Sequence, residues 1–299
     1  MHNGEEFLEE TLNSVLNYAP KGDYEHIVVD DGSTDGTNLI LKKFLKDIKV
    51  IEQKQSGQSN AINAGLKIAQ GDLSLIVNCD DPLTSPKLFT KSFEMFEKFP
   101  EIVCVYPNWE IIDQNGIVLS SIEVPEFSVD ELFGNFNCLV GPGGVFKTQV
   151  GKQLQGWNSS YKFVPDYDFW LRMSGFGDFK KIPETLACWR THGKSISVQG
   201  RGFLMAAERI RVIKENLNSR ALTSKQKKHA ISAAYYSAAV LSAFDPLVPG
   251  RKFLLIAIRF NPLLIFRKKP WHLAFLLATP ISSVILKSSR NAISKFYSN

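Results

Sequence analysis

The sequence lacks the features that mark several large protein classes. It contains four cysteines in 299 residues, and no two of them have the C-x-x-C spacing of a zinc or redox site. A disulfide framework is not expected in a chain of this length, so reduced thiols of an intracellular protein are predicted. The polar, acidic N-terminus does not resemble a signal peptide. No apolar run reaches the roughly 20 residues that span a bilayer.

Acidic residues are missing from the last part of the chain. From Arg251 to the end there are nine lysines or arginines and no aspartate or glutamate. Because the whole chain carries a net charge of +5, the first 250 residues together carry −4. A basic, apolar tail on a mildly acidic body indicates a binding partner. The many Leu, Ile and Phe residues in this tail favour a lipid surface over nucleic acid, and packing on the preceding domain is the alternative.

A glycine-rich dinucleotide motif is also missing. No G-x-G-x-x-G segment follows a strand-like run, and the GPGG segment from Gly141 to Gly144 lacks the required spacing. A nicotinamide-dependent dehydrogenase is therefore not expected.

What the first two hundred residues do contain is an alternation of helical and strand-like patterns. Helical spacing is found in residues 5–19, 37–48, 59–70 and 85–100, and strand-like runs in residues 25–33, 48–53, 73–79 and 102–112. This alternation predicts an α/β fold with a mostly parallel sheet and helices on both faces. After about residue 200 no strand-like stretch occurs. We therefore predict an α/β domain over residues 1–200 and a helical, basic, membrane-associating region over residues 201–299.

Two of the predicted strands end in paired carboxylates, Asp30–Asp31 and Asp80–Asp81. In α/β sheets, ligands bind just beyond the carboxyl ends of the strands. Adjacent carboxylates repel unless a positive charge lies nearby, and Mg²⁺ or Mn²⁺ commonly uses one or two carboxylates plus water and phosphate oxygens. Asp31 would accept hydrogen bonds from a nucleotide base or ribose. For both pairs, a simple turn or helix cap is the alternative.

Two later residues are further candidates. Asp166 lies at the start of a predicted amphipathic helix, either as a helix cap or as a general base facing a sugar hydroxyl. His192 lies between Arg190 and Lys194 in a segment without clear periodicity. A single histidine is more often an ordinary surface residue, and its position after the acidic motifs is what makes it a candidate.

The order of these motifs resembles the family 2 inverting nucleotide-sugar glycosyltransferases, which have a GT-A (Rossmann-like) fold. The resemblance covers residues 3–198. Its segments are NGEEFLEETLNSVL, IVVDDGSTDGT, SGQSNAINAGLKIAQGD, LIVNCDD, VPDYDFWLR and WRTHGKSIS, in this order. It implies metal-dependent transfer of a sugar from a nucleoside-diphosphate sugar to an acceptor hydroxyl, in surface polysaccharide or glycolipid synthesis.

The resemblance also implies a role for each matching residue. The nucleotide sugar would contact Asp30, Asp31, Gln58, Asn60 and Asp80, the metal would be held by Asp81, Asp80 and His192, and Asp166 would be the catalytic base. The metal would be Mg²⁺ or Mn²⁺. The acceptor would be lipid-linked or a saccharide, and nucleic acid is not expected as a partner. The implied location is the cytoplasm, peripherally at the inner face of the cell membrane.

The chain departs from the family pattern at three places, and the first two of these motivate an alternative. The apolar first strand that precedes the NGEEF segment in the family has no counterpart here, so that strand is expected to be missing. Pro165 replaces the usual glutamate before Asp166, and Cys79 stands where serine is common. The alternative is a catalytically inactive nucleotide-binding or scaffold protein of the same fold.

Overall fold

The computed structural model describes residues 1–22, 24–136, 138–193, 202–243, 245 and 247–266. These residues form two compact units. The first consists of residues 1–127, 138–160 and 165–192. The second consists of residues 128–136, 161–164 and the described residues after 192.

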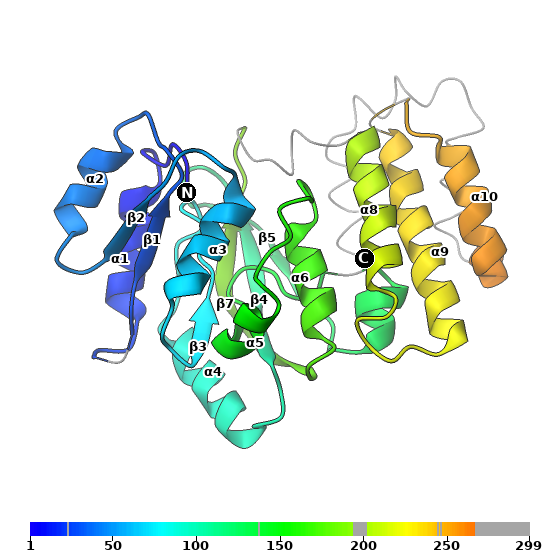
Figure 1. Ribbon diagram of the computed structural model, residues 1–299, viewed down its shortest axis with the longest axis horizontal. Coiled ribbons are helices and arrows are strands. Elements are labelled where there is room, and N and C mark those ends of the chain that lie inside the picture. The colour runs from blue at the N-terminus through cyan, green and yellow to red at the C-terminus, as the bar shows by residue number, and fades with distance from the viewer. Residues whose placement is uncertain (23, 137, 194–201, 244, 246, 267–299) are drawn as a thin grey trace. The chain divides into compact units, whose positions relative to one another are not determined.

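Two sheets lie in the first unit (Figure 1). The smaller sheet pairs β1 (Ile27–Asp30) with β2 (Lys49–Glu52) in parallel. The larger sheet has the order β3-β6-β4-β5, and β7 also pairs with β4. Its strands are β3 (Leu73–Leu75), β4 (Cys104–Ile112), β5 (Val118–Ile122), β6 (Val145–Lys147) and β7 (Phe179–Arg190).

The expectation of a mostly parallel sheet is wrong for the larger sheet. β4 and β7 are parallel, whereas β3–β6, β4–β6 and β4–β5 are antiparallel. The β4–β5 connection is a tight turn, in which the Gly116 amide donates to the Asp113 carbonyl and Gly116 has a φ of +82°. A connection this short can join only antiparallel neighbours. The chain keeps the predicted α/β architecture, with a mixed sheet.

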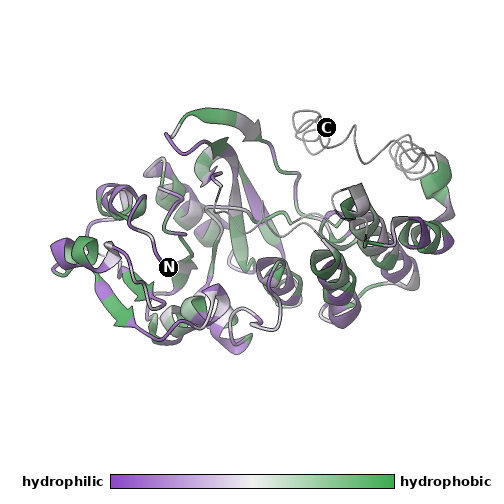
Figure 2. Cartoon of the chain, turned by 90° about the horizontal axis from the view of Figure 1, so that it is seen from above, coloured by the Kyte–Doolittle hydropathy of each residue, from purple (hydrophilic) through white to green (hydrophobic). Residues whose placement is uncertain are grey.

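The helices of the first unit are amphipathic and cover the sheets. They are α1 (Leu8–Tyr18), α2 (Thr37–Phe44), α3 (Gln58–Ile68), α4 (Lys87–Lys98), α5 (Thr148–Gln153) and α6 (Pro165–Met173). Helix α1 buries Leu8, Leu12 and Val15 on one face, as a 3.6-residue period requires. Leu8 and Leu12 pack against Leu41 and Phe44 of α2. In Figure 2, the helices carry hydrophilic residues on one side and hydrophobic residues on another.

An aromatic cluster fixes the start of α6. Phe146 of β6 contacts Phe169 and Trp170 of α6, with ring centroids 5.3 and 5.8 Å apart in edge-to-face arrangements. Fully burying one such side chain stabilises the fold by about 1.5–3 kcal/mol. Because these contacts anchor α6 on the sheet, the first turn of α6 is held in a defined place.

The second unit is helical in its described part. It contains α8 (Phe203–Asn216), α9 (Ser224–Val240) and α10 (Gly250–Phe260), and a π-helical turn (Asp130–Gly134). Helix α9 begins with a capping box between Thr223 and Gln226. In this part of the chain, no helix is both long and apolar enough to cross a membrane. Residues 267–299, which carry most of the predicted basic tail including Trp271, lie outside the described residues.

Candidate active site

The Asp80–Asp81 pair lies in a loop after β3. The predicted strand over residues 73–79 ends earlier, at Leu75, and Asn78 turns back toward the pair. Asp81 is 5% exposed. Its Oδ1 accepts a hydrogen bond of 2.8 Å from the Arg190 backbone N–H, and its Oδ2 accepts one of 2.8 Å from Asn78 Nδ2. Burial, followed by the charge of Asp80, raises the pKa of Asp81 well above its usual range.

Asp80 brings His192 into the same group. Asp80 Oδ2 lies 3.0 Å from His192 Nε2, across 112 residues of sequence. Both side chains keep some access to solvent, 24% for Asp80 and 15% for His192. The ring of Phe7 packs beside the imidazole, with centroids 5.2 Å apart. A carboxylate oxygen and an imidazole nitrogen therefore face one another at the surface of this loop.

Gln58 connects the start of α3 to this loop. Its Nε2 donates to Asn78 Oδ1 over 3.1 Å, so Gln58, Asn78 and Asp81 form one chain of hydrogen bonds. Asn60 behaves differently, because its Nδ2 donates to the Ser56 carbonyl within its own helix start. The structure thus brings Gln58 to the acidic pair, whereas Asn60, in the first turn of α3, bonds to the segment before the helix.

Asp30 and Asp31 organise the loops that follow β1 and β2. Asp30 Oδ1 accepts from the Ser33 hydroxyl at 2.5 Å. Asp31 accepts from Gln53 Nε2 at 2.6 Å and from the backbone N–H groups of Ser56 and Gly57, each at 2.8 Å. Burial alone would raise the pKa of Asp31, but these hydrogen bonds outweigh it and lower the pKa. Asp31 is therefore an ionised anchor for the segment leading into α3.

Asp166 lies in the first turn of α6. It is half-buried, and its Oδ1 accepts a 2.8 Å hydrogen bond from the Tyr167 N–H. Burial raises the pKa of Asp166. Its neighbour Asp168 is 2% exposed and forms an ion pair of 2.7 Å with Arg172. The two carboxylates of this turn therefore have different partners, and Asp168 serves the fold.

Two features of the site were not found from the sequence. Arg190 is 1% exposed and contacts both members of the acidic pair. Pro142 and Gly143 of the GPGG segment line a cavity of about 20 Å³ beside Asp81. Gly143 has a φ of +79°, and a Cβ there would lie 2.8 Å from that of Ala187, so glycine is required. In the sequence, Arg190 is marked only by its place two residues before His192, and GPGG was considered only as a dinucleotide motif.

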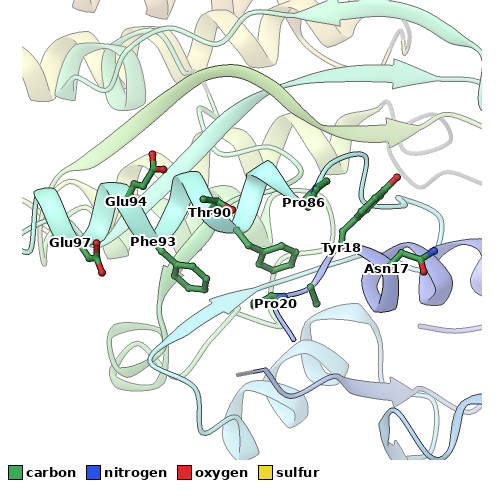
Figure 3. Close-up of a pocket in the computed structure, with 10 residues that line it drawn as sticks. Asn17, Tyr18, Pro20, Pro86, Thr90, Phe93, Glu94 and Glu97 are labelled. Carbon is green, nitrogen blue, oxygen red and sulfur yellow. The ribbon is translucent and has the colours of Figure 1, made fainter. Parts of the chain in front are cut away.

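A larger cavity in the first unit does not suit a phosphate ligand. It measures about 430 Å³ and lies between the end of α1 and α4 (Figure 3). Its lining is mostly apolar, with two carboxylates and no basic residue: Asn17, Tyr18, Ala19, Pro20, Pro86, Phe89, Thr90, Phe93, Glu94 and Glu97. A diphosphate would meet only like charge there. None of the residues predicted from sequence lies in it.

The loop after β3 that carries Asp80 and Asp81, called the acidic loop below, has the carboxylate oxygens that a divalent cation prefers. Within the described residues, no cluster of three or more His, Cys, Asp or Glu is arranged to enclose a metal. Mn²⁺ and Mg²⁺ do not need such a cage, because they bind through one or two carboxylates with water and substrate phosphates. Carboxylate oxygens suit this class of ion. Asp80, with His192 and Asp81 beside it, therefore fits a cation shared with a ligand.

Comparisons with known proteins find related glycosyltransferases. The model of the family described as glycosyl transferase family 2 matches residues 1–143. Chondroitin synthase of Escherichia coli is 26% identical over 221 residues, covering 73% of this chain and 32% of that protein. A poly(ribitol-phosphate) beta-glucosyltransferase of Bacillus spizizenii is 30% identical over 159 residues, covering 51% of this chain and 25% of that protein. The chain thus spans between a quarter and a third of these two relatives.

Solved structures share the fold. Residues 1–349 of S. aureus TarS superpose with a TM-score of 0.66 at 18% identity, covering 88% of this chain and 79% of that one. The mannosyltransferase PcManGT from Pyrobaculum calidifontis superposes with a TM-score of 0.57 at 14% identity, covering 95% of this chain and 84% of that one. At these identities the likeness concerns the fold alone. The family match identifies residues 1–143 as a glycosyl transferase family 2 region, and the chain has the GT-A fold of these structures.

Proposed function

We propose that this protein is a metal-dependent, inverting glycosyltransferase that uses a nucleoside-diphosphate sugar. The observation that carries the proposal is the contact between Asp80 Oδ2 and His192 Nε2, 3.0 Å apart beside the buried Asp81. This arrangement brings three candidate ligands from two distant parts of the sequence together beside the loop after β3.

The donor would bind across this loop and the segment after β2. Asp80, Asp81 and His192 would hold Mg²⁺ or Mn²⁺, and the bound cation would neutralise charge developing on the leaving diphosphate. Asp30, Asp31, Gln58 and Asn60 would face the nucleotide sugar, directly or by fixing the loops around it. TarS has been crystallised with UDP and with UDP-GlcNAc, and a solved structure of PcManGT is a complex with GDP-Man and Mn²⁺. These complexes support the choice of donor class and cofactor.

Asp166 would be the base for the acceptor. Its raised pKa makes its carboxylate a stronger proton acceptor near neutral pH than an ordinary aspartate. It would take the proton of the acceptor hydroxyl while that oxygen attacks the anomeric carbon from the side opposite the diphosphate. One displacement of this kind inverts the anomeric configuration and needs no enzyme nucleophile.

The acceptor is proposed to be a saccharide or a lipid-linked saccharide of a cell-surface polymer or glycolipid. Relatives include a chondroitin synthase, a poly(ribitol-phosphate) beta-glucosyltransferase and a poly-beta-1,6-N-acetyl-D-glucosamine synthase. These proteins build or decorate polymers, which supports an acceptor of this class.

We further propose peripheral binding to the inner face of the cell membrane. Helix α10 exposes Arg251, Lys252, Leu255 and Arg259 at positions that share one face, and it contains no acidic residue. Such a stripe suits anionic head groups. The full chain is expected to sediment with vesicles that contain anionic lipid, and less so as salt is raised. Equal sedimentation with neutral vesicles, or none with either, would contradict this part of the proposal.

Calorimetry of nucleotide binding tests the donor site. We expect one of UDP, GDP and dTDP to bind in the presence of Mn²⁺ or Mg²⁺ and to bind at least tenfold more weakly in EDTA. Absence of binding for all three nucleotides under every condition would reject the proposal. Binding without transfer of any sugar would favour the inactive alternative, which Pro165 in place of the family's glutamate suggests.

A further inference from the structure

Arg190 is a buried cation at the centre of the acidic loop. It ends β7, and with 1% of its surface exposed it is among the largest fully buried side chains described. A buried charge is costly unless it is paired and fully hydrogen-bonded. The partners of Arg190 therefore indicate what the residue holds in place.

Arg190 bonds to the acidic loop and to two other parts of the first unit, the β4–β5 turn and α1. Arg190 Nε donates to the Asp80 carbonyl at 2.9 Å, and the Arg190 backbone N–H donates to Asp81 Oδ1 at 2.8 Å. Nη1 donates to the Gln114 carbonyl at 3.1 Å. Nη2 donates to Glu10 Oε2 at 2.8 Å. Arg190 thus hydrogen-bonds to the backbone of Asp80 and to the carboxylate of Asp81. Its guanidinium also bonds to the β4–β5 turn and to α1, so these segments are connected through one side chain.

The same residue is linked to the position of His192. The Arg190 guanidinium stacks on the ring of Phe7, 4.8 Å from its centroid, and the imidazole of His192 packs on that ring at 5.2 Å. Phe7 directly precedes α1, and Glu10 lies in its first turn. The start of α1, Arg190 and the acidic loop therefore form one packed group.

We propose that Arg190 is a positioning residue that sets the geometry of Asp80, Asp81 and His192 for the divalent cation. This inference rests on the proposed function of that loop. The guanidinium itself is covered by its partners, so it acts through the carbonyl of Asp80 and not on the donor. A fork of fixed N–H groups can hold several oxygens in one geometry, which the single ammonium of lysine cannot do.

The test is Mn²⁺ binding by Arg190→Lys, measured from the electron paramagnetic resonance signal of free Mn²⁺ in the presence of the nucleotide that the wild type binds. The variant keeps the positive charge and the backbone N–H that donates to Asp81. It loses the guanidinium N–H groups that donate to Asp80, Gln114 and Glu10. We expect the half-saturating Mn²⁺ concentration to rise about tenfold, the lower end for residues that orient metal ligands. A value within twofold of wild type overturns the proposal.

Two controls separate positioning from stability. Phe179→Leu disturbs the aromatic packing at the opposite end of β7 from Arg190, and is expected to lower the melting temperature without changing Mn²⁺ affinity. Glu10→Gln keeps an oxygen acceptor for Nη2 and is expected to change the affinity less than threefold. If Phe179→Leu weakens Mn²⁺ binding as much as Arg190→Lys, the effect is one of stability and the proposal fails.

A second variant covers the case in which Arg190→Lys does not fold. Glu10→Ala leaves the acidic loop intact but removes the support of Nη2, and a rise of about threefold in half-saturating Mn²⁺ is expected. No change in that variant then overturns the proposal. Failure of the wild type itself to bind Mn²⁺ with any nucleotide would instead reject the proposed function, which keeps the two failures apart.

Discussion

Asp166→Asn is expected to lower the rate constant for sugar transfer by about 10²–10⁴-fold, the range that a positioned general base contributes. Asparagine has nearly the same shape and can still accept from the Tyr167 N–H through its side-chain oxygen. It cannot take up the proton of an acceptor hydroxyl. Binding of the nucleotide sugar, measured by calorimetry, should stay within twofold of wild type. A variant that transfers sugar at the wild-type rate would remove Asp166 from the mechanism.

Asp168→Asn is the matched control, because it makes the same chemical change two residues away. Asp168 is buried against Arg172, which also donates to the carbonyls of Leu154 and Gly156. Losing this ionic hydrogen bond should cost about 1.5–3 kcal/mol of the free energy of unfolding. The transfer rate of the folded variant should change less than threefold. Opposite results for the two variants would exchange the roles assigned to the two aspartates.

The pH profile offers an independent check on Asp166. Burial raises its pKa, and the ionised form is the base. The transfer rate should therefore fall as the pH falls through this raised pKa, above the value of about 3.9 for an unperturbed aspartate. In Asp166→Asn, the residual rate should lose this dependence on acid.

Local periodicity predicted the helices of the first unit except the short α5 (Thr148–Gln153). Helices were expected over residues 37–48 and 59–70, and α2 and α3 are found at Thr37–Phe44 and Gln58–Ile68. The prediction succeeds because the apolar spacing of an amphipathic helix can be read from residues that are close in the sequence. The pairing of β5 and β6 with their neighbours depends on contacts between distant segments, and the antiparallel pairs were accordingly missed.

The residues of the candidate site likewise fall into those that a local motif marks and those that only the packing of distant segments reveals. Asp80, Asp81 and Asp166 could be named from the sequence because a motif marks each of them. The role of Arg190 could not, since an arginine near a strand end is usually solvated and its burial follows only from the packing of α1, β7 and the acidic loop. Asn78 was likewise assigned to a strand, whereas its side chain bridges Gln58 and Asp81.

Asp80→Asn is expected to raise the half-saturating Mn²⁺ concentration for nucleotide binding about 100-fold. Asp80 combines partial exposure with a carboxylate oxygen 3.0 Å from His192 Nε2, so it is the acid best placed to meet a cation from solvent. The amide keeps the size of the side chain and can still hydrogen-bond to the imidazole, but it loses the negative charge that draws a hard cation. In EDTA, wild type and variant should bind the nucleotide equally weakly.

Asp47→Asn is the control for charge alone. Asp47 is an exposed carboxylate of the same unit, in the turn after α2, and it is absent from the acidic loop. Exposed charges beyond a Debye length of about 8 Å are largely screened at physiological salt, so this variant should bind Mn²⁺ as the wild type does. If Asp47→Asn and Asp80→Asn weaken Mn²⁺ binding equally, the cation responds to net charge and not to a site. If only Asp80→Asn does so, the metal lies at the loop after β3, where Asp80 and Asp81 would meet the cation and the diphosphate of the donor.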